Sequence, residues 1–232
     1  NIRAQSAPLL ICLLIVGTLQ ASVGQAELAD PTKRALYLSE TLPNQTLKER
    51  LQSCALGDFY PTDFSIAHRG APLGYPEHSR EGYVAAAEQG AGVIECDVTF
   101  TQDLALVCRH SQCDLATTTN ILQTPLAAKC FKPFRPANGQ QPASATCCTT
   151  DISLAEFKTL CARPDQSNKK AKTVAQYLAP LRSPVVSKPL ACGTLMTHAQ
   201  SIELIDALGR KFTPELKRPM VDMPFAPGFT QA

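Results

Sequence analysis

Apolar and polar positions along the chain alternate in two ways, one typical of strands and the other typical of helices. A short apolar run at 64–68 leads into a loop rich in Gly and Pro. A helical pattern at 80–89 follows, with Ser79 placed to cap its start and Gly90 placed to end it. A second run, at 92–100, is β-branched and mostly apolar. This strand–helix–strand order predicts a βαβ unit with a parallel sheet.

Two more strands are predicted further along the chain. The segment 103–110 reads as a third strand, and 211–217 reads as a fourth. Between them, Thr197 and Gln200 have the spacing of a capping box, followed by one apolar helical face that Gly209 ends. The regular pattern therefore continues to the last part of the sequence.

The stretch from about 127 to 192 breaks this regularity, because prolines and cysteines are frequent in it. One amphipathic helix is expected at 151–161, where Ser153 and Glu156 can form a capping box. The cysteines of this stretch are Cys130, Cys147, Cys148, Cys161 and Cys192. We interpret the stretch as a Cys-rich insertion that disulfides hold together.

The first 26 residues resemble a secretory signal peptide. Arg3 gives the positive start, 7–17 gives the apolar core, and Gly24 and Ala26 are small residues suited to cleavage. A membrane span needs about 20 apolar residues, so no stable span is expected after signal removal. A buried N-terminal helix is the alternative. The remaining residues, 27–232, would form the mature chain, secreted or periplasmic, beginning with a lead-in that carries a helix candidate at 47–56.

Cysteine usage agrees with export. Ten cysteines are present, nine of them after the predicted signal, which predicts disulfides with at least one cysteine left over. The sequon at Asn44 has meaning only in a eukaryotic secretory route. The net charge of +2 gives no indication of a nucleic-acid partner. A chain of 232 residues, 44% hydrophobic, can bury one sizeable core or two small ones.

Two acidic residues lie on one face of the second strand. Because side chains alternate along a strand, Glu95 and Asp97 share a face, while Ile94, Cys96 and Val98 share the other. Two carboxylates buried without partners would cost several kcal/mol or take up a proton. A divalent cation removes that conflict, and Ca²⁺ and Mg²⁺ prefer such oxygen ligands. The alternative is a pair of exposed carboxylates on a half-solvated sheet.

Histidines close two of the predicted strands. His68 follows the first strand and His110 ends the third. In parallel α/β sheets and barrels, catalytic groups gather at the carboxyl ends of strands, so this pair is a candidate for acid–base chemistry. His78 and His198 lack that placement, and we expect structural roles for both.

The fourth strand carries a similar combination. Glu215 and Lys217 are two residues apart and therefore point the same way. Glu215 could supply a third carboxylate to a cation, and Lys217 could face a phosphate. A surface ion pair is the alternative, and Pro214 fits poorly into a paired strand.

Several ordered motifs resemble the glycerophosphodiester phosphodiesterases. The motifs are "AHRG", "PEHS", "GAGVIECDVTFTQD", "LVCRHSQCDLATTTN" and "PELK", which together run from Ile66 to Lys217. The Cys-rich middle resembles the secreted, longer branch of that family. The resemblance implies a (β/α)₈ TIM barrel, a divalent metal (often Ca²⁺ or Mg²⁺), and hydrolysis of glycerophosphodiesters to glycerol 3-phosphate and an alcohol. The expected partner is a small-molecule glycerophosphodiester substrate, and the oligomeric state stays open.

The resemblance also implies roles for individual residues. His68 and His110 would be the acid–base pair. Arg69 would bind the phosphate, Lys217 would add positive charge, and Gly70 would give the ligand room. The metal would be held by three carboxylates: Glu95, Asp97 and Glu215.

The sequence departs from the family pattern in three ways. His78 stands where the family often has Asn, and Ser111 stands where it often has Asp, although Asp114 is close by. Four core strands are predicted, whereas a closed barrel needs eight. We therefore expect a partial barrel, its N-terminal half, in an incomplete chain. Two alternatives remain: a phospholipase D-like lyase on the same barrel, or an inactive, secreted, disulfide-rich binding fragment.

Overall fold

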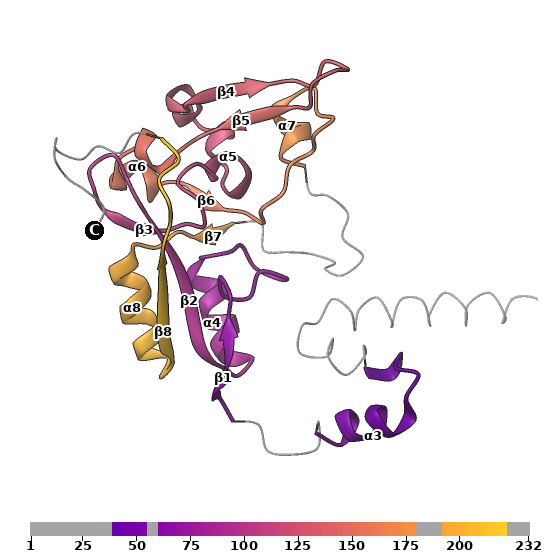
Figure 1. Cartoon of the computed structure of the whole chain (residues 1–232). Helices are drawn as coiled ribbons and strands as arrows, with labels where there is room; N and C mark the ends of the chain where they lie inside the picture. The colour runs from indigo at the N-terminus through magenta and orange to yellow at the C-terminus, as the bar shows by residue number, and fades with distance from the viewer. Residues whose placement is uncertain (1–38, 55–59, 180–191, 222–232) are drawn as a thin grey trace, which may run out of the picture. The chain divides into compact units, whose positions relative to one another are not determined.

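The computed structural model describes residues 39–54, 60–179 and 192–221 (Figure 1). The predicted signal peptide lies outside these ranges. The chain divides into two compact units, and the helix α3 (Gln45–Cys54) belongs to the first, close to the predicted 47–56. No helix in the described ranges is long and apolar enough to cross a membrane.

The second unit mixes helices and strands. Its helices are α4 (Arg80–Glu88), α5 (Leu115–Thr118), α6 (Leu154–Phe157), α7 (Val174–Tyr177) and α8 (His198–Ala207), with 3-10 turns η1 (Ile121–Gln123), η2 (Pro125–Lys129) and η3 (Thr149–Asp151). Its strands are β1 (Thr62–Ala67), β2 (Ala91–Phe100), β3 (Leu106–Cys108), β4 (Lys132–Arg135), β5 (Ser144–Thr146), β6 (Cys161–Ala162), β7 (Gly193–Thr194) and β8 (Lys211–Leu216).

β2 is the central strand of the main sheet. It pairs in parallel with β1 and with β8, and Val93 has Ile66 as its partner on one side and Lys211 on the other. The predicted βαβ unit is therefore confirmed as β1–α4–β2. Figure 1 shows α8 lying along β8, so a helix and a parallel strand are added in the same way on the other side of β2.

The third predicted strand is shorter than expected and runs in the opposite direction. β3 is antiparallel to β2, and Val98 pairs with both Cys108 and Leu216, so β3 lies on the edge opposite β8. A parallel connection needs a dozen or more residues, and the few residues between β2 and β3 allow only a hairpin. The four predicted core strands are therefore present in one four-stranded sheet, but β3 is antiparallel, so the described residues contain three parallel strands and no closed barrel.

The two faces of β2 differ as the sequence pattern predicts. Ile94, Cys96 and Val98 are buried in a core formed with residues of α4 and α8. Glu95 and Asp97 point to the opposite face and are also buried. One strand therefore carries the apolar core of the unit on one side and acidic groups on the other.

Capping residues fix the two long helices of this unit. The hydroxyl of Ser79 accepts a hydrogen bond from the N–H of Gly82 at the start of α4. Thr197 and Gln200 form the predicted capping box at the start of α8. Gly90 and Gly209, placed just beyond these helices, have positive φ angles of 89° and 65°.

The Cys-rich segment has a separate hydrophobic core, to which Ile121, Phe157 and Tyr177 contribute. The capping box of Ser153 and Glu156 is present, but the helix is α6 alone and not the whole of 151–161. The reason is that Cys161 belongs to β6, which pairs with β7.

Four disulfides are present in the described residues. The Cys-rich segment and its borders contain Cys113–Cys148, Cys130–Cys147 and Cys161–Cys192. The fourth, Cys96–Cys108, joins β2 to β3 inside the sheet core. Cys54 is the free cysteine of the described residues, so the expectation of paired cysteines with one left over is confirmed.

Candidate active site

The candidate site lies where β1, β2 and β8 end. His68 and Arg69 directly follow β1, and Lys217 directly follows β8. Asp97 of β2 and Glu215 of β8 are partners in the parallel pairing, so their side chains share one face of the sheet. Acidic residues from two strands far apart in the sequence are therefore brought to the same place.

Glu95 is buried, with 7% of the residue exposed. Its Oε2 accepts a hydrogen bond of 2.7 Å from the backbone N–H of Arg69, whereas its Oε1 is buried without a hydrogen-bond partner. Burial raises the pKa of Glu95 well above its usual range, and the charges of Asp97 and Glu215 raise it further. The side chain therefore resists carrying a negative charge while no cation faces it.

Asp97 is fully buried and lies between two partners. Its Oδ2 is 2.9 Å from Nε2 of His78, and its Oδ1 is 3.3 Å from Nζ of Lys217. Burial favours the neutral carboxyl, but the hydrogen bond from His78 and the charge of Lys217 outweigh burial and lower the pKa of Asp97. Asp97 is therefore the charged member of the pair that it forms with Glu95.

Glu215 differs from the two carboxylates of β2, because 58% of its side chain is exposed. Its Oε1 is 2.5 Å from Nζ of Lys217. Burial acts to lower the pKa of Lys217, but the hydrogen bond to Glu215 and the charge of Asp97 raise it. The ammonium group of Lys217 thus lies against the carboxylates of both Glu215 and Asp97. Glu215 is on the same face of the sheet as Glu95 and Asp97, but its carboxylate is not part of the close group of donor atoms that they form.

His78 lies against the acidic pair Glu95 and Asp97, a position that the sequence pattern did not predict. One ligand atom each from His78, Glu95 and Asp97 lie within 4.8 Å of one another. The ring is fully buried, and its Nδ1 is 3.0 Å from the hydroxyl of Tyr83. Burial lowers the pKa of His78 to about 4, so the ring is neutral. The residue belongs to a loop and not to a strand end, and the only available signal was its place in the "PEHS" motif.

A row of alternating charges continues away from Asp97. Nη1 of Arg69 is 3.0 Å from Oε2 of Glu77, and Oε1 of Glu77 is 3.3 Å from Nη2 of Arg109. Arg109 is fully buried, and its Nε is 3.5 Å from Oδ1 of Asp114. Burial acts to raise the pKa of Glu77, but the charge of Arg109 and the hydrogen bond and charge of Arg69 lower it. Glu77 and Arg109 were not predicted, and together they fix the Arg69 side chain.

The two predicted catalytic histidines lie beside the arginines of this row, His68 directly after β1 and His110 two residues after β3. His68 is exposed and His110 is half-buried. The loop that begins at His110 is held by Asp114, whose Oδ2 accepts a hydrogen bond from the N–H of Ser111. Asp114 therefore ties down the backbone beside His110, although it is not at the position where the family often has Asp.

The backbone conformation and close packing at Gly70 both require glycine. Its φ is 90°, and an added Cβ would lie 3.0 Å from the carbonyl carbon of Gly82 and 3.2 Å from Cδ1 of Tyr83. Close packing against the first turn of α4 therefore requires glycine here, and the expectation that Gly70 gives a ligand room stays a prediction. Arg69, beside it, has a φ of 63°, a strained conformation for a residue with a side chain.

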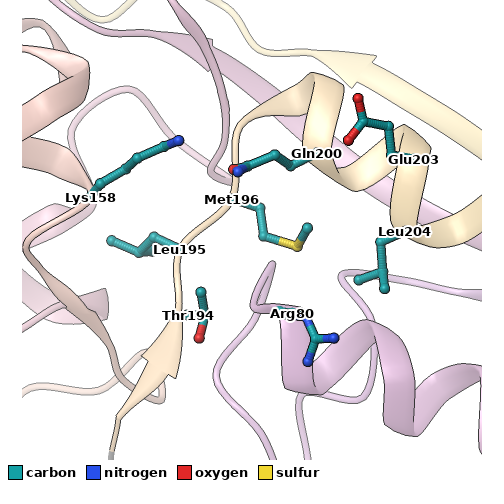
Figure 2. Close-up of a pocket in the computed structure, with 8 residues that line it drawn as sticks. All are labelled: Arg80, Lys158, Thr194, Leu195, Met196, Gln200, Glu203 and Leu204. Carbon is teal, nitrogen blue, oxygen red and sulfur yellow. The ribbon is translucent and has the colours of Figure 1, made fainter.

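A separate pocket of about 470 Å³ lies elsewhere, between the starts of α4 and α8 and strand β7 (Figure 2). Arg80, Lys158 and Glu203 are among the eight residues that line it. None of the eight is a predicted site residue. The carboxylate cluster is therefore the candidate site on chemical grounds, and the pocket is not part of it.

Comparison with known proteins identifies the group to which the chain is related. Residues 68–223 match the glycerophosphoryl diester phosphodiesterase family. The "Probable glycerophosphodiester phosphodiesterase 1" of Mycobacterium tuberculosis is 47% identical over 49 residues, which cover 21% of this chain and 18% of that protein. Glycerophosphodiester phosphodiesterase GDPD6 of Arabidopsis thaliana is 29% identical over 135 residues, which cover 58% of this chain and 33% of that protein.

A solved structure, the glycerophosphodiester phosphodiesterase from Agrobacterium tumefaciens, has a TM-score of 0.41 at 19% identity. The match covers 68% of this chain and 48% of that one. The chain thus spans less than half of the length of each of these relatives. The family match covers well over half of the present sequence, and the chain belongs to the glycerophosphoryl diester phosphodiesterase family.

Proposed function

We propose that the protein hydrolyses glycerophosphodiesters to glycerol 3-phosphate and an alcohol, as a metal-dependent enzyme. The observation that carries the proposal is a buried acidic pair, Glu95 and Asp97, placed beside two cationic side chains, Arg69 and Lys217. Acidic groups suit a divalent cation, and cationic groups suit a phosphate. Membership of the family supports the same assignment.

The residues of the site fit a divalent cation. Oε1 of Glu95 is a buried oxygen without a hydrogen-bond partner, and a buried acceptor left in this state is costly. Hard ions such as Ca²⁺ and Mg²⁺ take carboxylate oxygens as ligands. Glu215, on the same face, would be the third carboxylate. When bound, the cation supplies positive charge that stabilises the phosphoryl oxygens in the transition state.

The remaining residues would bind the substrate and move protons. Arg69, fixed by Glu77, would donate hydrogen bonds to the phosphate, and Lys217 would add charge beside it. His68 and His110 would act as the acid–base pair. One imidazole takes the proton of the attacking hydroxyl or water, and the other gives a proton to the oxygen of the leaving alcohol as the P–O bond breaks.

We further propose that residues 27–232 form part of a (β/α)₈ catalytic domain with a Cys-rich insertion at about 127–192. The β1–α4–β2 unit and the α8–β8 pair support this arrangement. The four disulfides support secretion or export to the periplasm.

The proposal is tested with the full-length protein and glycerophosphocholine as substrate. Glycerol 3-phosphate should be released, and release should stop with excess EDTA and return when Mg²⁺ or Ca²⁺ is added back. Activity that survives excess EDTA would contradict the metal dependence. Failure of the folded, metal-supplied protein to hydrolyse any glycerophosphodiester would contradict the reaction itself.

Substitution of Glu95 tests whether the acidic pair takes part in catalysis or only stabilises the fold. Glu95→Gln should lower turnover by about 10²-fold or more, because the uncharged amide is a poor ligand for a hard cation. Glu203→Gln, an exposed change on α8, is the matched control and should leave turnover unchanged. Full activity of Glu95→Gln would favour the structural alternative.

A further inference from the structure

We propose that His78 binds the divalent cation through Nε2, together with Glu95 and Asp97, and that this nitrogen ligand raises the affinity for Co²⁺ and Zn²⁺ relative to Ca²⁺. The inference rests on the proposed cation site and deepens it. Three independent features of His78 carry it: donor spacing, the partner of its second nitrogen, and the rigidity of its backbone.

The first feature is the spacing of the donor atoms. Nε2 of His78 is 2.9 Å from Oδ2 of Asp97, and the ligand atoms of His78, Glu95 and Asp97 lie within 4.8 Å of one another. Adjacent ligands of an octahedral ion, each about 2.1 Å from the metal, are about 3.0 Å apart. The imidazole and the carboxylate therefore already have the separation of neighbouring ligands.

The second feature is the contact between Nδ1 of His78 and the hydroxyl of Tyr83, at 3.0 Å. The phenol hydroxyl can either donate or accept a hydrogen bond. Without a cation, the hydroxyl can donate to Nδ1 while Nε2–H donates to Asp97. With a cation, Nδ1–H can donate to the hydroxyl, which leaves the Nε2 lone pair free. Histidines that bind metals usually have such a partner for the second nitrogen.

The third feature is that His78 has little freedom to leave this position. The residue is fully buried, its φ is 54°, and its N–H donates a hydrogen bond of 3.1 Å to the carbonyl oxygen of Arg69. A cation that binds Oδ2 of Asp97 would therefore meet an imidazole already in place. A strained backbone held at a site in this way is typical of residues with a functional role.

A nitrogen ligand changes which ions the site prefers. Carboxylates alone suit Mg²⁺ and Ca²⁺, whereas imidazole suits later ions such as Zn²⁺ and raises affinity along the order that runs from Mn²⁺ to Cu²⁺. The other interpretation of the same contact is that His78 only holds Asp97 in place through Nε2–H. An asparagine at this position could still donate an N–H to Asp97 but would offer no imidazole nitrogen, so His78→Asn separates the two interpretations.

The test begins with the metal-free, full-length protein. Calorimetric titration with Co²⁺ and Ca²⁺ should show that His78→Asn lowers the Co²⁺ affinity about tenfold or more, and the Ca²⁺ affinity by less than about threefold. An equal loss for both ions would overturn the inference, because it would show that His78 acts only through Asp97. Circular dichroism checks the fold of the variant, and His78→Gln replaces it if the asparagine variant does not fold.

A second measurement detects the nitrogen directly. Electron spin-echo spectra of the Mn²⁺-loaded protein should show coupling to an imidazole nitrogen in the wild type, and His78→Asn should remove it. His198→Asn is the matched control and should retain the coupling, because His198 lies on the other face of the sheet beside Cys96. Bound Mn²⁺ without nitrogen coupling in the wild type would overturn the inference and leave the proposed carboxylate site intact. Failure of every ion to bind would overturn both proposals.

Discussion

Asp97 and Glu215 are direct partners in the parallel pairing of β2 and β8, and the ammonium group of Lys217 lies against both carboxylates. With Glu95, they place three acidic side chains on one face of the sheet. Glu95 differs from both, because no cationic side chain of the described residues forms an ion pair with it and its Oε1 is buried without a hydrogen-bond partner. Without a cation, the charged form of Glu95 is therefore the least stabilised of the three carboxylates.

Glu95→Gln should raise the unfolding free energy of the metal-free protein by about 1 kcal/mol. Burial, together with repulsion from Asp97 and Glu215, disfavours the charged form of Glu95, and an amide oxygen can still accept the hydrogen bond from Arg69. Urea denaturation in EDTA measures the change. A clear loss of stability in the variant would show that the cluster is not strained without metal.

When metal is supplied, the wild type should become more stable than Glu95→Gln, the reverse of the order expected without metal. Saturating Mg²⁺ should stabilise the wild type by mass action, and should stabilise Glu95→Gln much less, because the variant binds the ion weakly. Glu203→Gln should behave as the wild type does under both conditions, because its site is an exposed position on α8.

His68→Ala and His110→Ala should each lower the turnover number by about 10²-fold or more, since proton transfer by a positioned side chain contributes that much. His68 is exposed and His110 is half-buried, so the substitutions should leave the fold intact. Steady-state kinetics with glycerophosphocholine measures the change, and His198→Ala serves as the control. Turnover at the wild-type rate in either variant would remove that histidine from the mechanism.

Local sequence patterns predicted the parts of the structure that local physics determines. The alternation along β2 gave the correct face for Glu95 and Asp97, because side-chain direction in a strand has a period of two. Ser79 and Thr197 were found as helix caps, because a cap is defined by residues within one turn. The site is built on these elements, so its main acidic pair could be predicted.

Other features depend on contacts between distant segments and could not be predicted in the same way. The direction of β3 is an exception, because its short connection to β2 determines it locally, although the apolar pattern alone does not give a strand's direction. His78 reaches Asp97 only because the loop after β1 folds over the end of β2, and Arg109 finds Glu77 across the same loop. Glu77 and His78 lie in this loop and not at a strand end, and Arg109, although it follows β3, is 32 residues from Glu77, so the pattern of strands did not indicate these contacts.

Arg109→Met should lower the unfolding free energy by about 3 to 5 kcal/mol, because it removes the partner of a buried charge. Arg109 is fully buried and pairs with Glu77 and Asp114, so its loss removes the cationic partner of Asp114 and leaves Glu77 with Arg69 alone. Lys129→Met, at an exposed ion pair with Glu156, is the matched comparison and should cost less than about 1 kcal/mol. Denaturant unfolding measures both.

A double variant tests the cause of that loss. Arg109→Met with Glu77→Gln should recover part of the stability, because the uncharged amide no longer needs a counter-ion. If the double variant is as unstable as the sum of the two single changes, the packing of the Arg109 side chain accounts for the loss, and the ion pair does not.

Asp114→Asn should become more stable relative to the wild type as the pH rises from about 4. Burial raises the pKa of Asp114, although the charge of Arg109 opposes the shift. An acid whose folded pKa is raised contributes stability that is fully present below its unfolded pKa, and that contribution is lost as the pH rises through the folded value. Asparagine does not ionise, and its amide oxygen can still accept the hydrogen bond from the N–H of Ser111. Unfolding free energies of the two proteins, measured in urea between pH 4 and pH 8, give the difference directly. If the wild type instead gains on the variant with rising pH, then the attraction of Arg109 outweighs burial, and the loop after His110 is held by an ion pair rather than by a hydrogen bond alone.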